Sequence, residues 1–90
     1  MAHFARIQDG IVIDKHVVDN NVITDEAGVE QETLGQNYLS DLWGGEPSSY
    51  IQYSYNANFR GCNPGFGYLW KPKPRTKEGG VFEAPPEPAP

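Results

Sequence analysis

The sequence has very little cysteine and no long apolar stretch, and each absence removes a class of protein. Its single Cys, at position 62, excludes a disulfide framework within one chain and a zinc site built from several cysteines. No apolar run approaches the roughly 18 residues that span a membrane. Residues 1–25 mix apolar with charged side chains, so we expect neither a membrane span nor a secretory signal.

Positive charge is scarce over most of the chain, whose formal net charge at pH 7 is −5. Residues 1–58 carry two cations and nine anions, whereas residues 59–77 carry five cations and no anion. The overall acidity argues against direct nucleic-acid binding as the main function. An acidic segment followed by a basic one favours packing between copies of the chain or against another protein. The simpler explanation is that both segments form ordinary charged surface in contact with solvent.

The first eighteen residues predict a β-hairpin. Residues 3–8 and 11–18 favour strands and flank Asp9-Gly10, which is typical of a two-residue type I′ turn because both positions need a positive φ. This register places His3 opposite His16. Since side chains alternate between the two faces of a strand, the buried face is expected to hold Phe4, Ile11, Ile13 and Val17.

Residues 33–43 carry the pattern of the one predicted helix. Thr33 and Gln36 have the spacing of a capping box. Leu34, Tyr38 and Leu42 recur at helical spacing, with Leu39 and Trp43 beside them, and predict an apolar stripe that covers the hairpin. Gly44-Gly45 ends the helix.

Aromatic residues are concentrated in residues 50–70, which hold seven of the chain's eleven. Two short strands are predicted there, at 50–55 and 66–70. This density exceeds what a small core requires, so we expect part of it on the surface, in protein contact rather than in sugar stacking. The expected anchors of that contact are Tyr50, Tyr53, Trp70 and Phe82.

Proline is concentrated at the end of the chain, with six of the eight prolines in residues 71–90. Because proline fixes φ and donates no hydrogen bond, this segment is predicted to be an extended arm that becomes ordered on another surface. Residues 79–83 have the pattern of a last edge strand or anchor within it. Arg60, Lys71, Lys73 and Arg75 are expected to meet acidic patches on a partner.

The predicted fold class is therefore a strand-rich α+β domain. Residues 1–70 form a small twisted antiparallel sheet with one short helix, and residues 71–90 form the extended Pro-rich arm. We expect a homo-oligomer or a complex with another protein, and no membrane association.

The chemistry-bearing residues do not predict an active site. In the hairpin register, His3 and His16 have Cβ atoms about 5 Å apart and Asp14 lies on the same face, a set adequate for zinc or iron. An exposed polar face of a hairpin explains it better. Cys62 has no neighbouring base, and the Gly-rich residues 61–67 lack the lysine of a phosphate loop. We therefore expect no enzyme, cofactor or metal.

Several ordered blocks of the sequence resemble a family of small proteins encoded by tailed bacteriophages, notably marine and cyanobacterial ones. The chain opens with Met-Ala-His-Phe-Ala and continues with Asp-Glu-Ala-Gly-Val-Glu-Gln-Glu at 25–32. Tyr-Ile-Gln-Tyr-Ser-Tyr-Asn follows at 50–56, then Asn-Phe-Arg at 58–60 and Gly-Phe-Gly-Tyr at 65–68. The likeness covers residues 1–70 and departs in the tail, where such proteins continue with a segment like Phe-Ile-Pro-Pro-Lys-Pro.

This resemblance implies a structural protein of the phage virion, made in the host cytoplasm, with no catalytic residues to transfer. A capsid decoration protein, or cement protein, bound to the major capsid protein is the first expectation. The alternative is a tail or baseplate component, including a module that binds sugars of the host surface.

Overall fold

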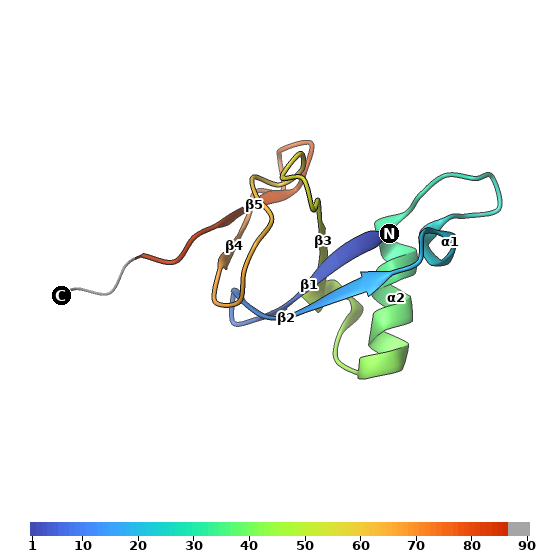
Figure 1. Ribbon diagram of the computed structural model, residues 1–90, viewed down its shortest axis with the longest axis horizontal. Helices are drawn as coiled ribbons and strands as arrows, with labels where there is room; N and C mark the ends of the chain where they lie inside the picture. The colour runs from blue at the N-terminus through green and yellow to red at the C-terminus, as the bar shows by residue number, and fades with distance from the viewer. Residues whose placement is uncertain (87–90) are drawn as a thin grey trace.

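The structure, a computed structural model, describes residues 1–86 and contains a five-stranded antiparallel sheet with strand order β3-β1-β2-β4-β5 (Figure 1). Helix α2 lies on one face of the sheet, so the predicted strand-rich α+β class is confirmed. The elements are β1 (Ala2–Gln8), β2 (Ile11–Val18), α1 (Asn20–Ile23), α2 (Glu32–Trp43), the 3-10 turn η1 (Pro47–Ser49), β3 (Tyr50–Tyr53), β4 (Leu69–Pro72) and β5 (Gly80–Glu83).

The β1–β2 hairpin has the predicted turn but not the predicted register. Asp9 and Gly10 have φ values of 55° and 78°, as a type I′ turn requires. Gln8 pairs with Ile11 as expected, but a bulge between Arg6 and Ile7 then shifts the register by one residue. His3 therefore pairs with Val17 rather than with His16.

Of the four residues predicted on the buried face only Phe4 is buried, and the bulge accounts for the residues that follow it but not for Ile11. Ile11, Ile13 and Val17 are 40%, 46% and 55% exposed, whereas Val12 and Val18 are buried. An extra residue in one strand moves the following side chains relative to the partner strand, so a strict alternation counted from the turn fails beyond it.

The first hydrophobic core lies between the sheet and α2. It consists of Ala2, Phe4, Val18, Ile23, Leu39 and Tyr50. α2 begins one residue earlier than predicted, and Gln31, not Thr33, is its N-cap, without a side-chain capping bond. The short α1, whose first turn is capped by Asp19, was not predicted and contributes Ile23 to this core.

Gly35 decides which side of α2 faces the sheet. A Cβ at this position would lie 2.7 Å from Phe4 Cε1 and 2.9 Å from Ile23 Cγ2, so only glycine permits this close approach. The buried residues of α2 are accordingly Gly35 and Leu39. The predicted stripe of Leu34, Tyr38 and Leu42 is wrong, because close packing at Gly35 rotates this stripe away from the sheet.

A second core covers the opposite face of the sheet. Its buried members are Ala5, Val12, Tyr53 and Phe82. Phe82 contacts Trp70 and Tyr53, with ring centroids 4.8 Å and 6.4 Å away. Consecutive residues of β1, Phe4 and Ala5, thus belong to different cores because strand side chains alternate.

The second core corrects the domain boundary predicted at residue 70. β4 and β5 pair antiparallel, with Trp70 opposite Phe82 and Pro72 opposite Gly80. Pro72 is tolerated because it ends β4. Residues 71–83 therefore belong to the sheet and its connecting loop, and the edge strand expected at 79–83 is confirmed. Residues 84–86 are exposed, and the rest of the predicted arm, residues 87–90, lies outside the described residues.

Candidate functional site

Three of the four predicted aromatic anchors are buried inside the chain. Tyr50, Tyr53 and Phe82 are 0%, 5% and 2% exposed, and Trp70 is half-buried against Phe82. The prediction that the first three anchor a partner is wrong, because a sheet with a core on each face uses more aromatic side chains than a sheet with one buried face. Tyr50 also donates from its hydroxyl to the carbonyl of Gly44 at 2.9 Å.

Arg60 is likewise buried, at 9% exposure, and its guanidinium donates four hydrogen bonds within the chain. Nη1 and Nη2 donate to the two carboxylate oxygens of Glu32 at 2.6 and 3.0 Å. Nη1 also donates to the carbonyl of Gln52 at 3.0 Å, and Nε donates to that of Glu78 at 2.7 Å. Meeting an acidic patch on a partner is therefore the wrong role for Arg60. Its role is to join α2, β3 and the loop before β5.

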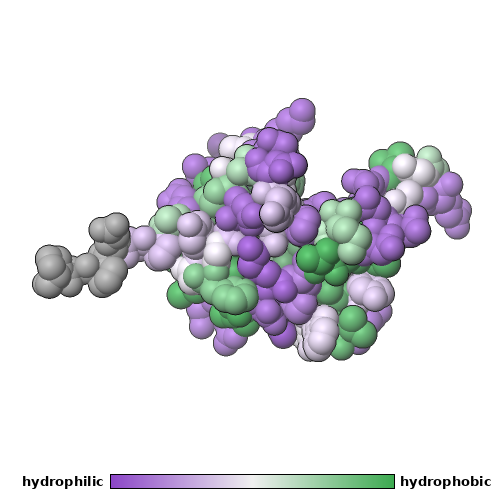
Figure 2. All heavy atoms as spheres, viewed as in Figure 1, coloured by the Kyte–Doolittle hydropathy of each residue, from purple (hydrophilic) through white to green (hydrophobic). Residues whose placement is uncertain are grey.

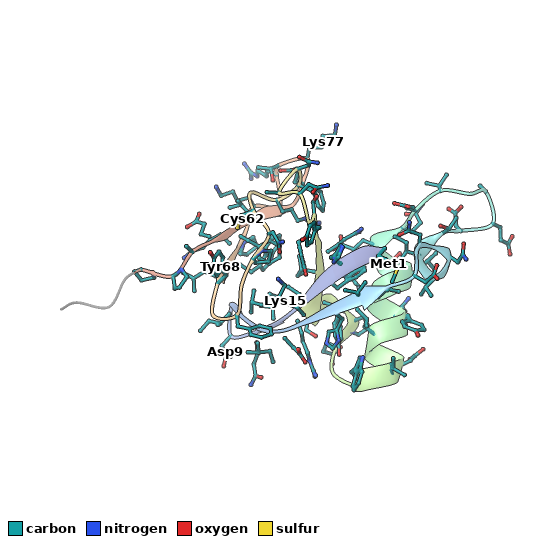
Figure 3. All side chains as sticks on the ribbon, viewed as in Figure 1. Met1, Asp9, Lys15, Cys62, Tyr68 and Lys77 are labelled. Carbon is teal, nitrogen blue, oxygen red and sulfur yellow. The ribbon has the colours of Figure 1, made fainter. Side chains whose placement is uncertain are left out.

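The other predicted cations remain on the surface. Lys71, Lys73, Arg75 and Lys77, here called the basic strip, are all exposed. Within residues 1–86 none of the four forms an ion pair. They lie on β4 and on the loop that leads to β5, and Figure 3 shows Lys77 projecting from the top of the view. This strip can take up an acidic surface without breaking an internal contact.

A second available surface is one that the sequence assigned to the core. Tyr38, Leu42 and Trp43, here called the α2 patch, are 43%, 58% and 59% exposed. Tyr38 and Leu42 are one helical turn apart and so adjoin each other. Trp43 stacks on His16 of β2, with ring centroids 5.5 Å apart. Figure 2 shows green, hydrophobic atoms near the end of β2 and at the lower end of α2, with paler atoms between them. The sequence feature that could have identified this patch as exposed is Gly35. It lies one helical turn before Leu39, and these two residues form the buried side of α2.

The candidate metal ligands are not brought together. His3 contacts Tyr53 and Tyr55, with ring centroids 5.5 and 5.6 Å away, on the face of the second core. His16 lies on the opposite face, against Tyr50, with Nε2 3.6 Å from Asp14 Oδ2. The sheet separates the two imidazoles. Among residues 1–86 no group of three or more His, Cys, Asp or Glu side chains is placed to hold a metal ion.

A hollow of about 410 Å³ lies beside His3 at the start of β1 and the end of β3. Its lining includes His3, Tyr55 and Phe59 as aromatic rings, with Gln52 and Asn56 as side-chain amides. Burial lowers the pKa of His3 below its usual value of 6.5, and the α-ammonium and Lys15 lower it further. The neutral form of His3 is therefore favoured, and this form suits stacking and hydrogen bonding rather than the binding of anions.

Cys62 is packed against β5 and is a poor nucleophile. Its Sγ donates to the carbonyl of Phe82 at 3.5 Å, and burial raises the pKa of the thiol. A raised pKa reduces the thiolate population that nucleophilic chemistry needs.

Comparisons of the chain with family models, with curated proteins and with solved structures give no match. Over the part of the chain that the structure describes, no helix is long and apolar enough to cross a membrane. The candidate functional sites of the chain are therefore the α2 patch, the basic strip and the hollow beside His3.

Proposed function

We propose that this chain is a structural protein of a phage virion, and specifically a capsid decoration protein that binds the major capsid protein. The observation that carries the proposal is the presence of two available surfaces of different chemistry on different elements. The α2 patch offers aromatic and aliphatic contact, and the basic strip offers charge. A protein that joins neighbouring shell subunits needs two such contacts.

The chemistry of the two surfaces suits adhesion. Aromatic side chains supply large contact areas at low conformational cost, and Tyr and Trp dominate the energetics of protein interfaces. The basic strip supplies steering toward acidic surfaces and a fixed orientation rather than most of the affinity. Repetition over a symmetric shell multiplies modest individual contacts into stable occupancy.

The residues that carry the resemblance to phage proteins build the fold. Glu32 ends the second block, Gln52 lies in the third, and Arg60 ends the Asn-Phe-Arg segment. All three meet in one cluster, because Glu32 binds the amide of Gln52 and the guanidinium of Arg60. The blocks that carry the likeness therefore have a structural role in this chain. The proposal for the virion rests on that likeness, and the proposal for adhesion rests on the two surfaces.

The direct test is to image intact phage particles at subnanometre resolution and to fit the structure into any density of this size. Density that repeats over the shell lattice, with the α2 patch or the basic strip against capsid subunits, is the expected result. Absence of the chain from the particles would overturn the proposal, and density confined to the tail would replace cement with the tail or baseplate alternative.

Surface variants then test which contact matters. Leu42→Lys should weaken binding to particles that lack the protein, because it places a charge in the α2 patch. Val29→Lys is the matched control, since Val29 is 52% exposed and lies in the loop before α2. Charge reversal of Lys71, Lys73 and Arg75 should reduce binding most at low ionic strength. Equal binding by Leu42→Lys and Val29→Lys would remove the α2 patch from the proposal.

Deletion of residues 71–90 is not a usable test of an arm, because it removes β5 and the buried Phe82. Deletion from Ala84 onward keeps every strand. Loss of particle binding on that shorter deletion, with unchanged unfolding, would assign adhesion to the end of the chain in addition to the two surfaces.

The hollow beside His3 favours a second candidate function, binding of a host-surface sugar. Aromatic rings stack on sugar faces and amides bond to hydroxyls, and both are present there. Saturable binding to cell-wall polysaccharide that is lost in Tyr55→Ala and retained in Phe66→Ala would support it. Phe66 is a suitable control because it is exposed, at 70%, and does not line the hollow.

A further inference from the structure

The outer edge of β3 is closed by side chains from elsewhere in the chain. Gln36 Nε2 donates to the carbonyl of Tyr50 at 2.7 Å. The amide of Gln52 donates to Glu32 Oε2 at 2.7 Å, and Arg60 Nη1 donates to the carbonyl of Gln52 at 3.0 Å. With these backbone groups occupied, no further strand can add to β3.

The outer edge of β5 is covered at Phe82. The amide of Phe82 donates to the carbonyl of Arg60 at 2.9 Å, and the thiol of Cys62 donates to the carbonyl of Phe82 at 3.5 Å. Both terminal strands thus make contacts on their outer edges, and a longer open edge lies between them in the strand order, on β2.

β2 has such an edge beyond its contact with β4. In an antiparallel sheet, successive residues of a strand direct their backbone N–H and C=O groups alternately to one neighbouring strand and to the other. The backbone groups of Gln52 point away from β1, which fixes this alternation for the strands that follow. Gln52 is opposite Phe4, so Phe4 directs its groups toward β2, where it pairs with His16. The residues on either side of His16, Lys15 and Val17, consequently direct their backbone groups away from β1.

These outward groups are almost without partners. β4 pairs with β2 only at Ile11 and Leu69 and then diverges from it (Figure 1). The amide of Lys15 donates to Asp14 Oδ1 at 2.9 Å. For the carbonyl of Lys15 and for both backbone groups of Val17, residues 1–86 provide no hydrogen-bond partner.

We propose that this edge pairs with the same edge of a second copy of the chain, antiparallel and centred on His16. In that register Lys15 of each copy lies opposite Val17 of the other, and both residues direct their backbone groups outward. The amide of Val17 in each copy then donates to the carbonyl of Lys15 in the other. The amide of Lys15 exchanges Asp14 Oδ1, an exposed carboxylate, for the carbonyl of Val17 in the other copy, and the two sheets become continuous across a two-fold axis. The pair is closed, because a two-fold contact occupies the same edge on both copies.

The chemistry of the edge favours a second copy over a different partner. A two-fold contact must be complementary to itself, and residues 14–18 carry one acid and one base, so the edge is neutral although the chain is acidic. The α2 patch continues this edge, since Trp43 stacks on His16. An axis through His16 brings the two patches together, and the apolar area that they bury supplements a short strand pairing.

Amide hydrogen exchange of the full chain tests the proposal. Protection of the Val17 amide should rise about fourfold between about 10 µM and about 1 mM chain, because exchange proceeds through the monomer and a dimer with a Kd near about 0.1 mM forms over this range. The Gln52 amide is the internal control, because Glu32 already binds it and its protection should not depend on concentration. Concentration-independent exchange at Val17 would overturn the proposal.

A pair of variants tests the same contact by mass. Val17→Pro removes the outward donor without removing a bond to β1, and Val17→Thr keeps both the donor and the shape. Sedimentation equilibrium should show dimers for the wild type and for Val17→Thr, and monomers for Val17→Pro. A wild type that is monomeric at about 1 mM, or dimers that persist in a folded Val17→Pro, would contradict the assignment.

Discussion

Arg60 and Glu32 form a two-point ion pair across 28 residues of sequence, with Nη1 to Oε2 at 2.6 Å and Nη2 to Oε1 at 3.0 Å. The same arginine has a φ of 59°, a left-handed conformation that costs free energy for any residue with a side chain. The chain tolerates this conformation because the guanidinium binds the Glu32 carboxylate and the carbonyls of Gln52 and Glu78, which lie on three separate segments.

Replacement of Arg60 by Ala should lower the free energy of unfolding by about 3 kcal/mol, because Glu32 and the carbonyl of Gln52 lose their partner. Urea unfolding followed by circular dichroism measures the change. Arg75→Ala is the matched control and should stay within about 0.5 kcal/mol of the wild type, since Arg75 is exposed. Equal stability of the two variants would contradict the role of Arg60.

Gly35→Ala should destabilise the chain although alanine is the better helix former. The gain in helix propensity is about 1 kcal/mol, whereas overpacking against Phe4 and Ile23 costs about 1–3 kcal/mol. Asn37→Ala, at an exposed position of the same helix, should instead be neutral or stabilising by about 0.5 kcal/mol. Thermal unfolding compares the two, and a Gly35→Ala variant more stable than Asn37→Ala would refute the close approach.

Phe82→Ala should remove about 4 kcal/mol of stability, because Phe82 fills the second core between Tyr53 and Trp70. Phe66→Ala removes the same atoms from an exposed position and should change stability by about 0.5 kcal/mol or less. Similar unfolding midpoints for the two variants would place residues 80–83 outside the folded domain.

Titration of His3 by NMR should give a pKa below 6.5, because burial, the α-ammonium and Lys15 all lower the pKa. The unfolded chain then binds this proton more readily than the folded one. The stability contributed by neutral His3 is complete above pH 6.5 and is lost as the pH falls from there to the folded pKa. Lys15→Gln should raise the His3 pKa and Lys77→Gln should not, and an unchanged value in Lys15→Gln would contradict the Coulombic contribution.

The local features of the fold were predictable where short-range chemistry determines them. Asp9-Gly10 specifies its turn, and the helix lies within one residue of its predicted start and ends at its predicted end, Trp43. The bulge at Arg6 was not predictable, since nothing in an alternating strand marks an extra residue. The resulting register shift leaves the side chain of Val17 exposed instead of buried, and it places His3 and His16 on opposite faces of the sheet.

The surface was harder to predict than the fold, because exposure depends on contacts between distant segments. The density of aromatics at 50–70 indicated a partner, yet Tyr50 and Tyr53 fill two different cores. Conversely, the helical spacing of Tyr38 and Leu42 indicated a core position. Tyr38 and Leu42 face solvent because Gly35 packs closely against Phe4 and so fixes the rotation of α2. This contact exists only once the sheet has formed, so the sequence of the helix does not reveal it.

The two cores divide the chain by position, and this division sets an order of assembly during synthesis. The core beneath α2 draws only on Ala2 to Tyr50, so it can close before the second half of the chain leaves the ribosome. The opposite core needs Phe82 and cannot close until that residue has left the ribosome. Until then Ala5, Val12 and Tyr53 face water on a nascent sheet, and this is the interval in which a chaperone would find apolar surface to hold.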